Sequence, residues 1–219
     1  SVGCDSTLSL HLNILSSVSE SPSGAEATKL YADNIQYLTM LSAEELGGPL
    51  TAYQSPEEFD ACDGTKSLAD GVNLYMQERQ TFGLCYRTKI GDDIDGDNAG
   101  YKLHLVYGCQ ASVSPRNYQS TNESPSANNM SWEITTTPVS IAPIAVDGVV
   151  KEFKPTSIIT IDSTKFTGDT TKKGYLAALE AILYGSVTDD DVPVVTPAEL
   201  PTPDEVYLLL TTGSRTPSS

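Results

Sequence analysis

The run from Asp92 to Asn98, Asp-Asp-Ile-Asp-Gly-Asp-Asn, contains residue types that could bind a metal ion. Carboxylate and amide oxygens at alternate positions suit Ca²⁺, which is a hard cation with oxygen ligands. The spacing of a helix–loop–helix calcium site fails, however. Counting from Asp93 places Asn98 where a glycine is needed and His104 where a bidentate glutamate belongs. We therefore favour a hairpin turn rich in Asp, Asn and Gly, with a calcium site as the alternative.

Groups that could act as general bases or nucleophiles are few. The chain has two histidines, His11 and His104. His104 falls on the polar face of an expected strand, which favours an exposed or interface role over a catalytic one. The sequence contains no Gly-x-Ser-x-Gly elbow, phosphate-binding loop, dinucleotide fingerprint or His-Glu-x-x-His pair. A carboxylate pair that cleaves a glycosidic bond is defined in space rather than in sequence, so it stays an alternative among 29 acidic residues. We predict no enzyme, and no catalytic, cofactor-binding or metal-ligating residue.

The four cysteines, Cys4, Cys62, Cys85 and Cys109, are scattered, without a Cys-x-x-Cys pair or a histidine at ligand spacing. A zinc site is therefore not expected. Cys85 and Cys109 lie in alternating segments and are expected to be small buried side chains. Scattered cysteines without a signal-peptide pattern favour a reducing compartment such as the cytoplasm.

The balance of charges also excludes function classes. With 29 acidic and 13 basic residues, the formal net charge is −16. Binding to nucleic acid or to an anionic membrane requires clustered Lys and Arg, so neither is expected. No apolar run approaches the roughly 20 residues of a membrane-spanning helix.

Strand patterns dominate the elements that would position these groups. Between Tyr101 and Cys109, alternate residues share one apolar face, while Lys102 and His104 share the other. The only tryptophan, Trp132, lies in a second alternating segment and is expected to anchor a core. In total we expect strands at 13–18, 28–31, 35–40, 50–53, 72–76, 82–86, 100–110, 130–139 and 157–161.

Capping signals predict the helices. The clearest helix spans 172–184 and ends at Gly185, with an apolar stripe for core packing. Ser42 and Ser55 each precede acidic residues at the spacing of a helix start, so two brief helices are expected there. Thr202-Pro203-Asp204-Glu205 would cap a short helix that ends at Gly213.

Several segments resemble one protein family. The runs 100–108 (GYKLHLVYG), 114–125 (SPRNYQSTNESP) and 131–139 (SWEITTTPV) are similar to the major tail protein of long-tailed bacteriophages and their prophages. The similarity covers most of the chain from about Leu15 onward, although 11–14 departs from the family, in which a Trp is usual. It continues, in order, through 18–26, 30–34, 41–45, 55–59, 79–84, 160–163, 176–180 and 200–205.

The resemblance implies a tail tube protein, which forms hexameric rings that stack into the conduit for DNA ejection. Its partners would be copies of itself, a tape-measure protein, and tail tip and tail terminator proteins. DNA would pass without specific binding, helped by an acidic lumen, although solubility alone explains most of the acids. The expected location is the virion tail, after synthesis and assembly in the host bacterial cytoplasm. The alternatives are a tube subunit of a contractile tail or secretion-like injection apparatus, and a β-sandwich adhesion or binding module.

The expected fold class is α+β, mostly β. We expect two packed antiparallel sheets, as in a tail tube-like β-sandwich or barrel, flanked by one main α-helix, with long loops and a C-terminal arm. Residues 1–185 would form this domain, and 186–219 a Pro-rich acidic arm with a short helix. The long segments 42–71 and 111–129 are the candidate assembly contacts, the first of them for ring-to-ring stacking.

Overall fold

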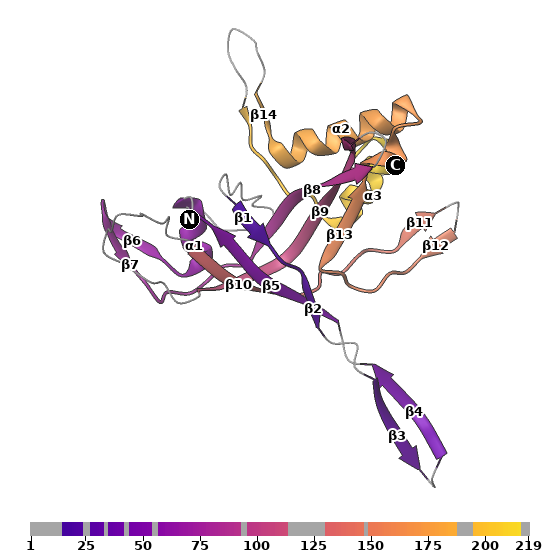
Figure 1. Ribbon diagram of the computed structural model, residues 1–219, viewed down its shortest axis with the longest axis horizontal. Coiled ribbons are helices and arrows are strands. Elements are labelled where there is room, and N and C mark those ends of the chain that lie inside the picture. Colours follow the sequence, from indigo (N-terminus) through magenta and orange to yellow (C-terminus); the bar gives the residue numbers. More distant parts are fainter. Residues whose placement is uncertain are drawn as a thin grey trace.

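One long strand, β9 (Gly96–Val113), organises the computed structural model of this chain. Strand β8 (Phe82–Asp92) pairs with it along one edge. Two other strands share the opposite edge: β13 (Ile158–Asp162) pairs with Lys102–Val106, and β10 (Met130–Thr136) pairs with Cys109–Val113. The sheet therefore forks along β9, and the two limbs curl around a buried interior (Figure 1).

The structure describes residues 15–23, 27–32, 35–41, 44–53, 57–92, 96–113, 130–146, 149–187 and 195–215. The described elements are mostly strands, with three α-helices, and all strand pairs are antiparallel. The remaining elements are β1 (Leu15–Val18), β2 (Ser21–Ser23), β3 (Ala27–Ala32), β4 (Ile35–Leu41), β5 (Glu45–Ala52), η1 (Glu57–Phe59), α1 (Asp60–Asp63), β6 (Lys66–Ala69), β7 (Val72–Leu74), β11 (Ile144–Val146), β12 (Val149–Lys151), η2 (Ser163–Phe166), α2 (Thr170–Tyr184), β14 (Ser186–Val187), β15 (Val195–Thr196) and α3 (Pro203–Thr212).

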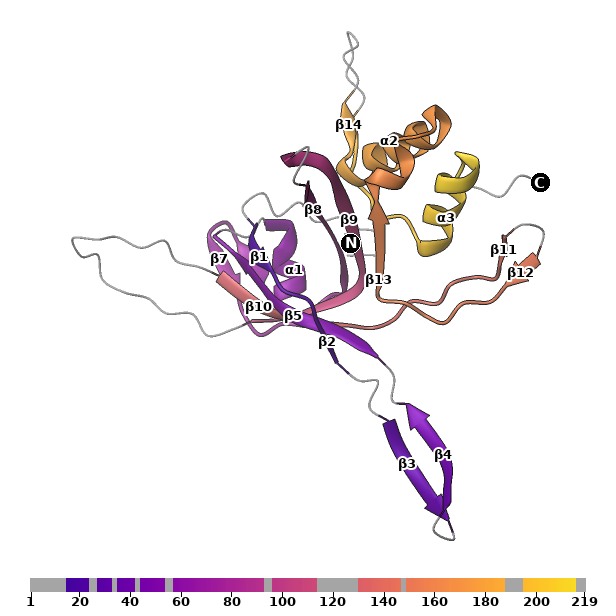
Figure 2. The same ribbon diagram turned by 45° about the vertical axis from the view of Figure 1, so that its right-hand side comes forward.

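The main sheet has seven strands in the order β1-β5-β10-β9-β13, with β2 also paired to β5 and β8 to β9. Strand pairs β3–β4, β6–β7, β11–β12 and β14–β15 form separate two-stranded sheets. Pairs β3–β4 and β11–β12 extend outward from the body of the molecule in both views of the ribbon (Figures 1 and 2), and β6–β7 lies at its edge in Figure 1. The prediction of a mostly β, α+β fold is confirmed. In place of a second large sheet, α2 and α3 cover the outer face of one limb.

Gly108 is the point at which β9 changes partners. Its φ of +61° lies in the left-handed region, and a Cβ atom there would meet the carbonyl oxygen of Thr137 at 2.2 Å. The amide of Thr137 donates a hydrogen bond to the Gly108 carbonyl oxygen at 3.0 Å. The register with β8 shifts by one residue between Phe82 and Leu84, which is a β-bulge.

The bulge reverses which face of β9 each later residue occupies. Tyr107 packs beneath the outer helices, whereas Cys109 is buried in the other core, together with Val106. The expectation that Cys109 shares a face with Tyr101 and Tyr107 is therefore wrong, because one extra residue in a strand inverts the alternation.

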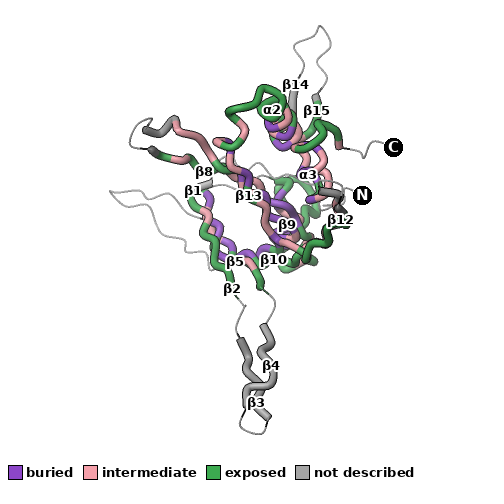
Figure 3. The backbone as a smooth tube through the Cα atoms, turned by 90° about the vertical axis from the view of Figure 1, so that its right-hand side faces the viewer, coloured by how far each residue is buried: buried purple, intermediate pink, exposed green. Residues whose placement is uncertain are grey.

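The inner core fills the concave side of the curled sheet. Trp132 is fully buried, as expected. Phe59, from the short η1–α1 segment, packs edge-on against Trp132 at 5.1 Å and against Phe82 at 5.3 Å between ring centroids. Buried residues follow the inside of the curve in Figure 3. Other buried residues of this core are Leu50, Ala52, Cys62, Leu84, Val106, Cys109, Ala111 and Ile134.

The outer core lies between the β9–β13 limb and the helices. Leu176, Leu179 and Leu183 of α2 are buried, so the predicted core packing of this helix is confirmed. The α2 helix has Asp169 as its N-cap and Gly185 as its C-cap. The α3 helix has the predicted capping box at Thr202 and Glu205, and it folds back on its own chain beside α2.

Two local signals are overridden by tertiary pairing. The brief helix expected from Ser42 is not present from Glu45 onward, because Glu45 begins strand β5, which pairs with β10 on one edge and with β1 and β2 on the other. Ser42 itself lies outside the described residues. Hydrogen bonding along both edges outweighs a capping signal that has no apolar stripe behind it. The expected brief helix after Ser55 is present as η1 and α1, although Ser55 itself lies outside the described residues.

The bend at Gly108 gives a direct stability test. We expect Gly108→Ala to lower the free energy of unfolding by at least about 2 kcal/mol, because a left-handed conformation costs a non-glycine residue about 1–2 kcal/mol before the contact with Thr137 is counted. Gly174 in α2 has open space around it, so Gly174→Ala should instead raise stability by about 0.5–1 kcal/mol. Urea unfolding of both variants makes the comparison. Equal effects at the two sites would contradict a special role for Gly108.

Candidate functional site

Hairpin β6–β7 presents large apolar side chains to solvent. Every residue of both strands is exposed, so the hairpin has no core of its own. Met76, just after β7, is 98% exposed and has a φ of +62°, which is rare for a residue with a side chain. We call the exposed set the β6–β7 apolar surface; it consists of Leu68, Val72, Leu74, Tyr75 and Met76.

The base of this hairpin is held firmly by backbone hydrogen bonds. The amide of Thr65 donates to the Asp60 carbonyl at 2.8 Å, and the amide of Gln77 donates to the Gly64 carbonyl at 2.9 Å. The buried Thr65 hydroxyl donates to Asp63 Oδ1 at 2.6 Å. An isolated two-stranded hairpin is marginally stable in water. A well-anchored hairpin whose apolar side chains are wet therefore has the properties of a contact surface.

A polar cluster ties the N-terminal strands to the sheet. The Tyr86 hydroxyl donates a hydrogen bond to the Glu20 carboxylate, and the Tyr86 ring stacks on the His104 imidazole with centroids 4.7 Å apart. The Thr88 hydroxyl lies 2.9 Å from His104 Nε2, and Glu20 Oε1 lies 3.2 Å from His104 Nδ1. Burial and then the hydrogen bond to Glu20 raise the pKa of Tyr86.

The order of groups Thr88, His104 and Glu20 is that of a nucleophilic triad, but its details do not support catalysis. Glu20 Oε1 lies close to His104 Nδ1, but His104 Nδ1 makes no directed hydrogen bond among the described atoms. The same Glu20 oxygen accepts the Tyr86 hydroxyl, so it does not serve His104 alone. The cluster is better understood as a clamp on the segment that joins β1 to β2.

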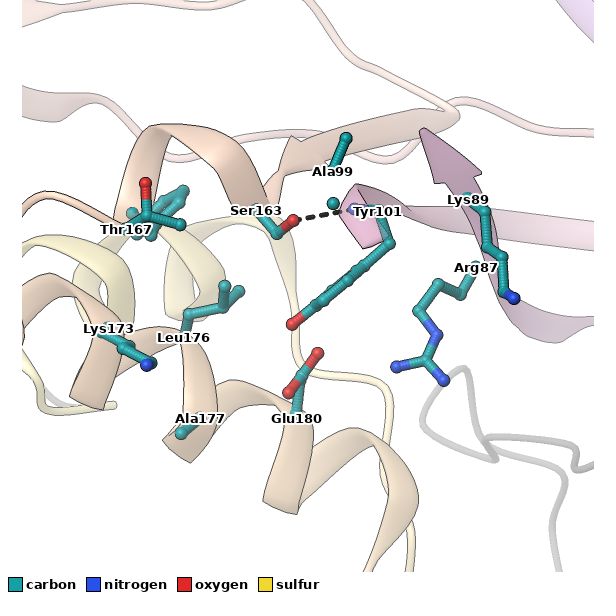
Figure 4. Close-up of a pocket in the computed structure, with 12 residues that line it drawn as sticks. Arg87, Lys89, Ala99, Tyr101, Ser163, Thr167, Lys173, Leu176, Ala177 and Glu180 are labelled. Carbon is teal, nitrogen blue, oxygen red and sulfur yellow. Dashed lines mark hydrogen bonds between the residues drawn. The ribbon is translucent and has the colours of Figure 1, made fainter. Parts of the chain in front are cut away.

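A cavity of about 460 Å³ opens between four elements, which are the second half of β8, the first part of β9, η2 and α2 (Figure 4). Its wall is fixed by a hydrogen bond from the Tyr101 amide to Ser163 Oγ at 2.9 Å. Gly100 permits this close approach, because a Cβ atom there would meet Thr164 Cγ2 at 2.7 Å. Its charged lining residues are Arg87, Lys89, Lys173 and Glu180.

Tyr101 stands in the centre of this cavity. The Arg87 guanidinium lies over its ring at 5.0 Å from the centroid, and the Tyr101 hydroxyl points to the Glu180 carboxylate (Figure 4). Burial, followed by the hydrogen bond to Glu180, raises the pKa of Tyr101 to about 12. Burial also raises the pKa of the neighbouring Cys85 thiol to about 12. Because the thiolate is the reactive form of cysteine, Cys85 is not poised as a nucleophile at neutral pH.

The residues that the sequence singles out differ in how far the structure buries them. Cys109 is buried as expected, and Cys85 is partly buried. His104 is not simply exposed, since only 14% of its side chain is accessible. The Asp93–Asp95 part of the possible calcium loop, His11, Cys4 and the segment 114–129 lie outside the described residues. Among the residues that are described, no group of three or more His, Cys, Asp or Glu side chains could hold a metal ion.

Sequence reasoning missed the cavity and the polar cluster. Arg87 and Lys89 alternate on one strand and Lys173 and Glu180 are seven residues apart on one helix, but no local pattern shows that these two faces meet.

None of the helices in the described part of the chain has the length and apolar character needed to cross a bilayer. No family model matches the chain, and comparison with curated proteins and with solved structures finds no match.

The clamp at Glu20 predicts a local change in dynamics. We expect Glu20→Ala to speed amide hydrogen exchange in β1 and β2 by about fivefold, because it removes contacts to Tyr86 and His104 worth about 1 kcal/mol. Exchange in α2 should not change. Glu133→Ala, at an exposed position of β10, is the control. Unchanged exchange in β1 and β2 would show that the pairing with β5 alone holds them.

The buried phenols and thiols predict a loss of stability at alkaline pH. The folded-state pKa values of Tyr101, Cys85 and Cys109 are about 12, and that of Tyr107 is also raised, mainly by burial. These groups ionise first in the unfolded chain, so the free energy of unfolding should fall as pH rises from about 9 to about 12.

Tyr107→Phe tests one of these contributions. This variant should fall less steeply above about pH 10, although it loses the hydrogen bond from the Tyr107 hydroxyl to the Pro201 carbonyl, 2.9 Å in length, at every pH. Thermal unfolding measured across this pH range gives the slopes, with Tyr75→Phe, an exposed residue, as the matched variant. Identical slopes for the wild type and Tyr107→Phe would refute the assignment.

Proposed function

We propose that this chain is a structural virion protein, the major tail tube subunit of a long-tailed bacteriophage. In this proposal the curled sheet with its outer helices is a tail tube-like domain, and copies of it form hexameric rings that stack into the conduit for DNA ejection. The tube encloses a tape-measure protein and is bounded by tail tip and tail terminator proteins. The observation that carries the proposal is the β6–β7 apolar surface. Its Leu68 lies within the segment 42–71 that the sequence indicates for ring stacking, and its other four residues follow directly after that segment.

Two features support assembly over a solitary role. First, the β6–β7 hairpin is anchored at its base and exposes five large apolar side chains that its own chain does not cover. Second, β3–β4 is a further two-stranded unit outside the main sheet, and such units gain stability when a neighbouring subunit covers them. The resemblance of the sequence to phage major tail proteins adds the identity of the assembly.

The energetics favour a cooperative polymer. Full burial of one large apolar side chain contributes about 1.5–3 kcal/mol, so five partly exposed ones contribute on the order of 5 kcal/mol. Association costs an estimated 4–15 kcal/mol in lost freedom of motion, which is as large as this gain or larger. A single contact of this kind therefore cannot hold two subunits together as a dimer. A ring and its stack give each subunit several contacts at once. We therefore infer subunits that stay monomeric when dilute and assemble steeply with concentration.

The net charge of −16 also acts on assembly. Like charges on neighbouring subunits repel, and dissolved salt screens this repulsion over about 10 Å at 0.1 M ionic strength. Added salt should therefore promote assembly, since the apolar contacts are not weakened by screening. Inside a tube, the same excess of acids would repel the DNA backbone during its passage.

Negative-stain electron microscopy and sedimentation of the full chain, dilute and then concentrated at low and high salt, test the proposal. Rings with sixfold symmetry, or hollow tubes with a regular axial repeat, are the expected result. Monomers under every condition, including in the presence of a tail-tip complex as initiator, would contradict it. Tubes that form only with a surrounding sheath protein would instead assign the chain to a contractile apparatus.

Substitutions in the β6–β7 apolar surface test which surface assembles. Leu68→Asp and Met76→Asp each place a charge where an apolar contact is proposed, and should raise the concentration required for assembly at least tenfold, equivalent to about 1.4 kcal/mol. Val150→Asp in β12, which is 67% exposed, is the matched control and should assemble like the wild type. Circular dichroism checks that each variant is folded. Normal assembly of both Leu68→Asp and Met76→Asp would exclude this hairpin from the contact.

A further inference from the structure

The cavity between β8, β9, η2 and α2 is lined by three cations that have no acidic partner among the described residues. Arg87, Lys89 and Lys173 form no ion pair within the part of the chain that the structure describes. The chain has 29 acidic residues for 13 basic ones, so acidic partners are not scarce. Arg215 shows the alternative, since its guanidinium contacts Glu199 at 2.9 Å and Glu205 at 3.1 Å. Three unpaired cations around one hollow therefore indicate a site for negative charge.

One oxygen of the fourth charged residue of the cavity, Glu180, has room for a further hydrogen-bond donor. The Glu180 carboxylate faces the Tyr101 hydroxyl inside the cavity (Figure 4). Its Oε1 atom is buried and has no hydrogen-bond partner among the described atoms. A buried polar atom of this kind normally has a partner from the protein or from ordered water, and an N–H group of a ligand can take the same place. A ligand that carries acidic groups for the cations and N–H groups for Glu180 has the chemistry of an acidic peptide in an extended conformation.

We propose that this cavity binds the acidic run Asp189-Asp190-Asp191 of a second copy of this chain. The charges match, since three carboxylates meet Arg87, Lys89 and Lys173. The apolar part of the cavity, with Phe166 and Leu176, accepts the aliphatic residues next to the acids. The choice of a second copy rests on the proposed self-assembly, and the site would link neighbouring subunits.

A peptide-binding experiment tests this inference. The probe is a fluorescein-labelled, end-capped peptide with the sequence of residues 186–195, SVTDDDVPVV, titrated with dilute full-length protein and followed by fluorescence anisotropy. Saturable binding that weakens with added salt is expected. The peptide with all three Asp residues replaced by Asn should bind at least about tenfold more weakly, since charge-assisted contacts contribute roughly 1.5–3 kcal/mol each.

Protein variants of equal net charge separate the cavity from general electrostatics. The double variant Arg87→Gln/Lys173→Gln should also bind at least about tenfold more weakly. The control double variant Lys151→Gln/Lys154→Gln removes two exposed cations away from the cavity and should bind within about twofold of the wild type. Equal losses in the two double variants would overturn the inference.

Other occupants give distinct results, each of which overturns the proposal. Displacement of the peptide by inorganic phosphate, beyond the effect of sodium chloride at equal ionic strength, would indicate a simple anion site. Binding only by a protein whose own Asp189, Asp190 and Asp191 are changed to Asn would indicate occupancy within one chain. Failure of the peptide to bind while tubes still form rejects this inference and leaves the tail tube proposal intact. Specific binding of the peptide by a protein that never assembles would support this inference and contradict the tail tube proposal.

Discussion

The close approach of the Gly108 backbone to Thr137 is the constraint on which the rest of the structure depends. It allows β9 to leave β13 and join β10 while β8 continues along its other edge. One strand thereby belongs to two sheet limbs, and the bulge places Val106 and Cys109 in one core and Tyr107 in the other. The inner core and the outer core are both consequences of this single inversion.

The two cores leave the projecting hairpins without a packing surface. The inner core is closed by Phe59, and the outer face of β9 is closed by α2 and α3. Hairpin β6–β7 emerges beside the inner core with all of its strand residues exposed. In the proposed tail tube, these exposed apolar side chains are buried only when the subunit meets other copies.

The arginine residues of the surface have two kinds of environment. Arg215 pairs with Glu199 and Glu205, which lowers the pKa of Glu199. Arg87 instead lies over the ring of Tyr101 at the mouth of a cavity. Contacts driven by apolar burial and contacts driven by charge respond oppositely to salt, so an assembly that uses both can hold its subunits over a range of conditions.

Local sequence determined much of the secondary structure. The alternation around Trp132 and in 100–107, the capping box at Thr202, and the apolar stripe of α2 each depend on residues near in the chain, and each was readable from it. Tertiary structure decided the rest. The capping signal at Ser42 and Glu45 was overridden by strand pairing on both edges of β5, and the face of Cys109 was set by a bulge opposite Gly83. The cavity joins Arg87 to Glu180, 93 residues apart, and the clamp joins Glu20 to Tyr86, 66 residues apart. Such contacts arise when packing brings distant segments together, and nothing in the local order of residues encodes them.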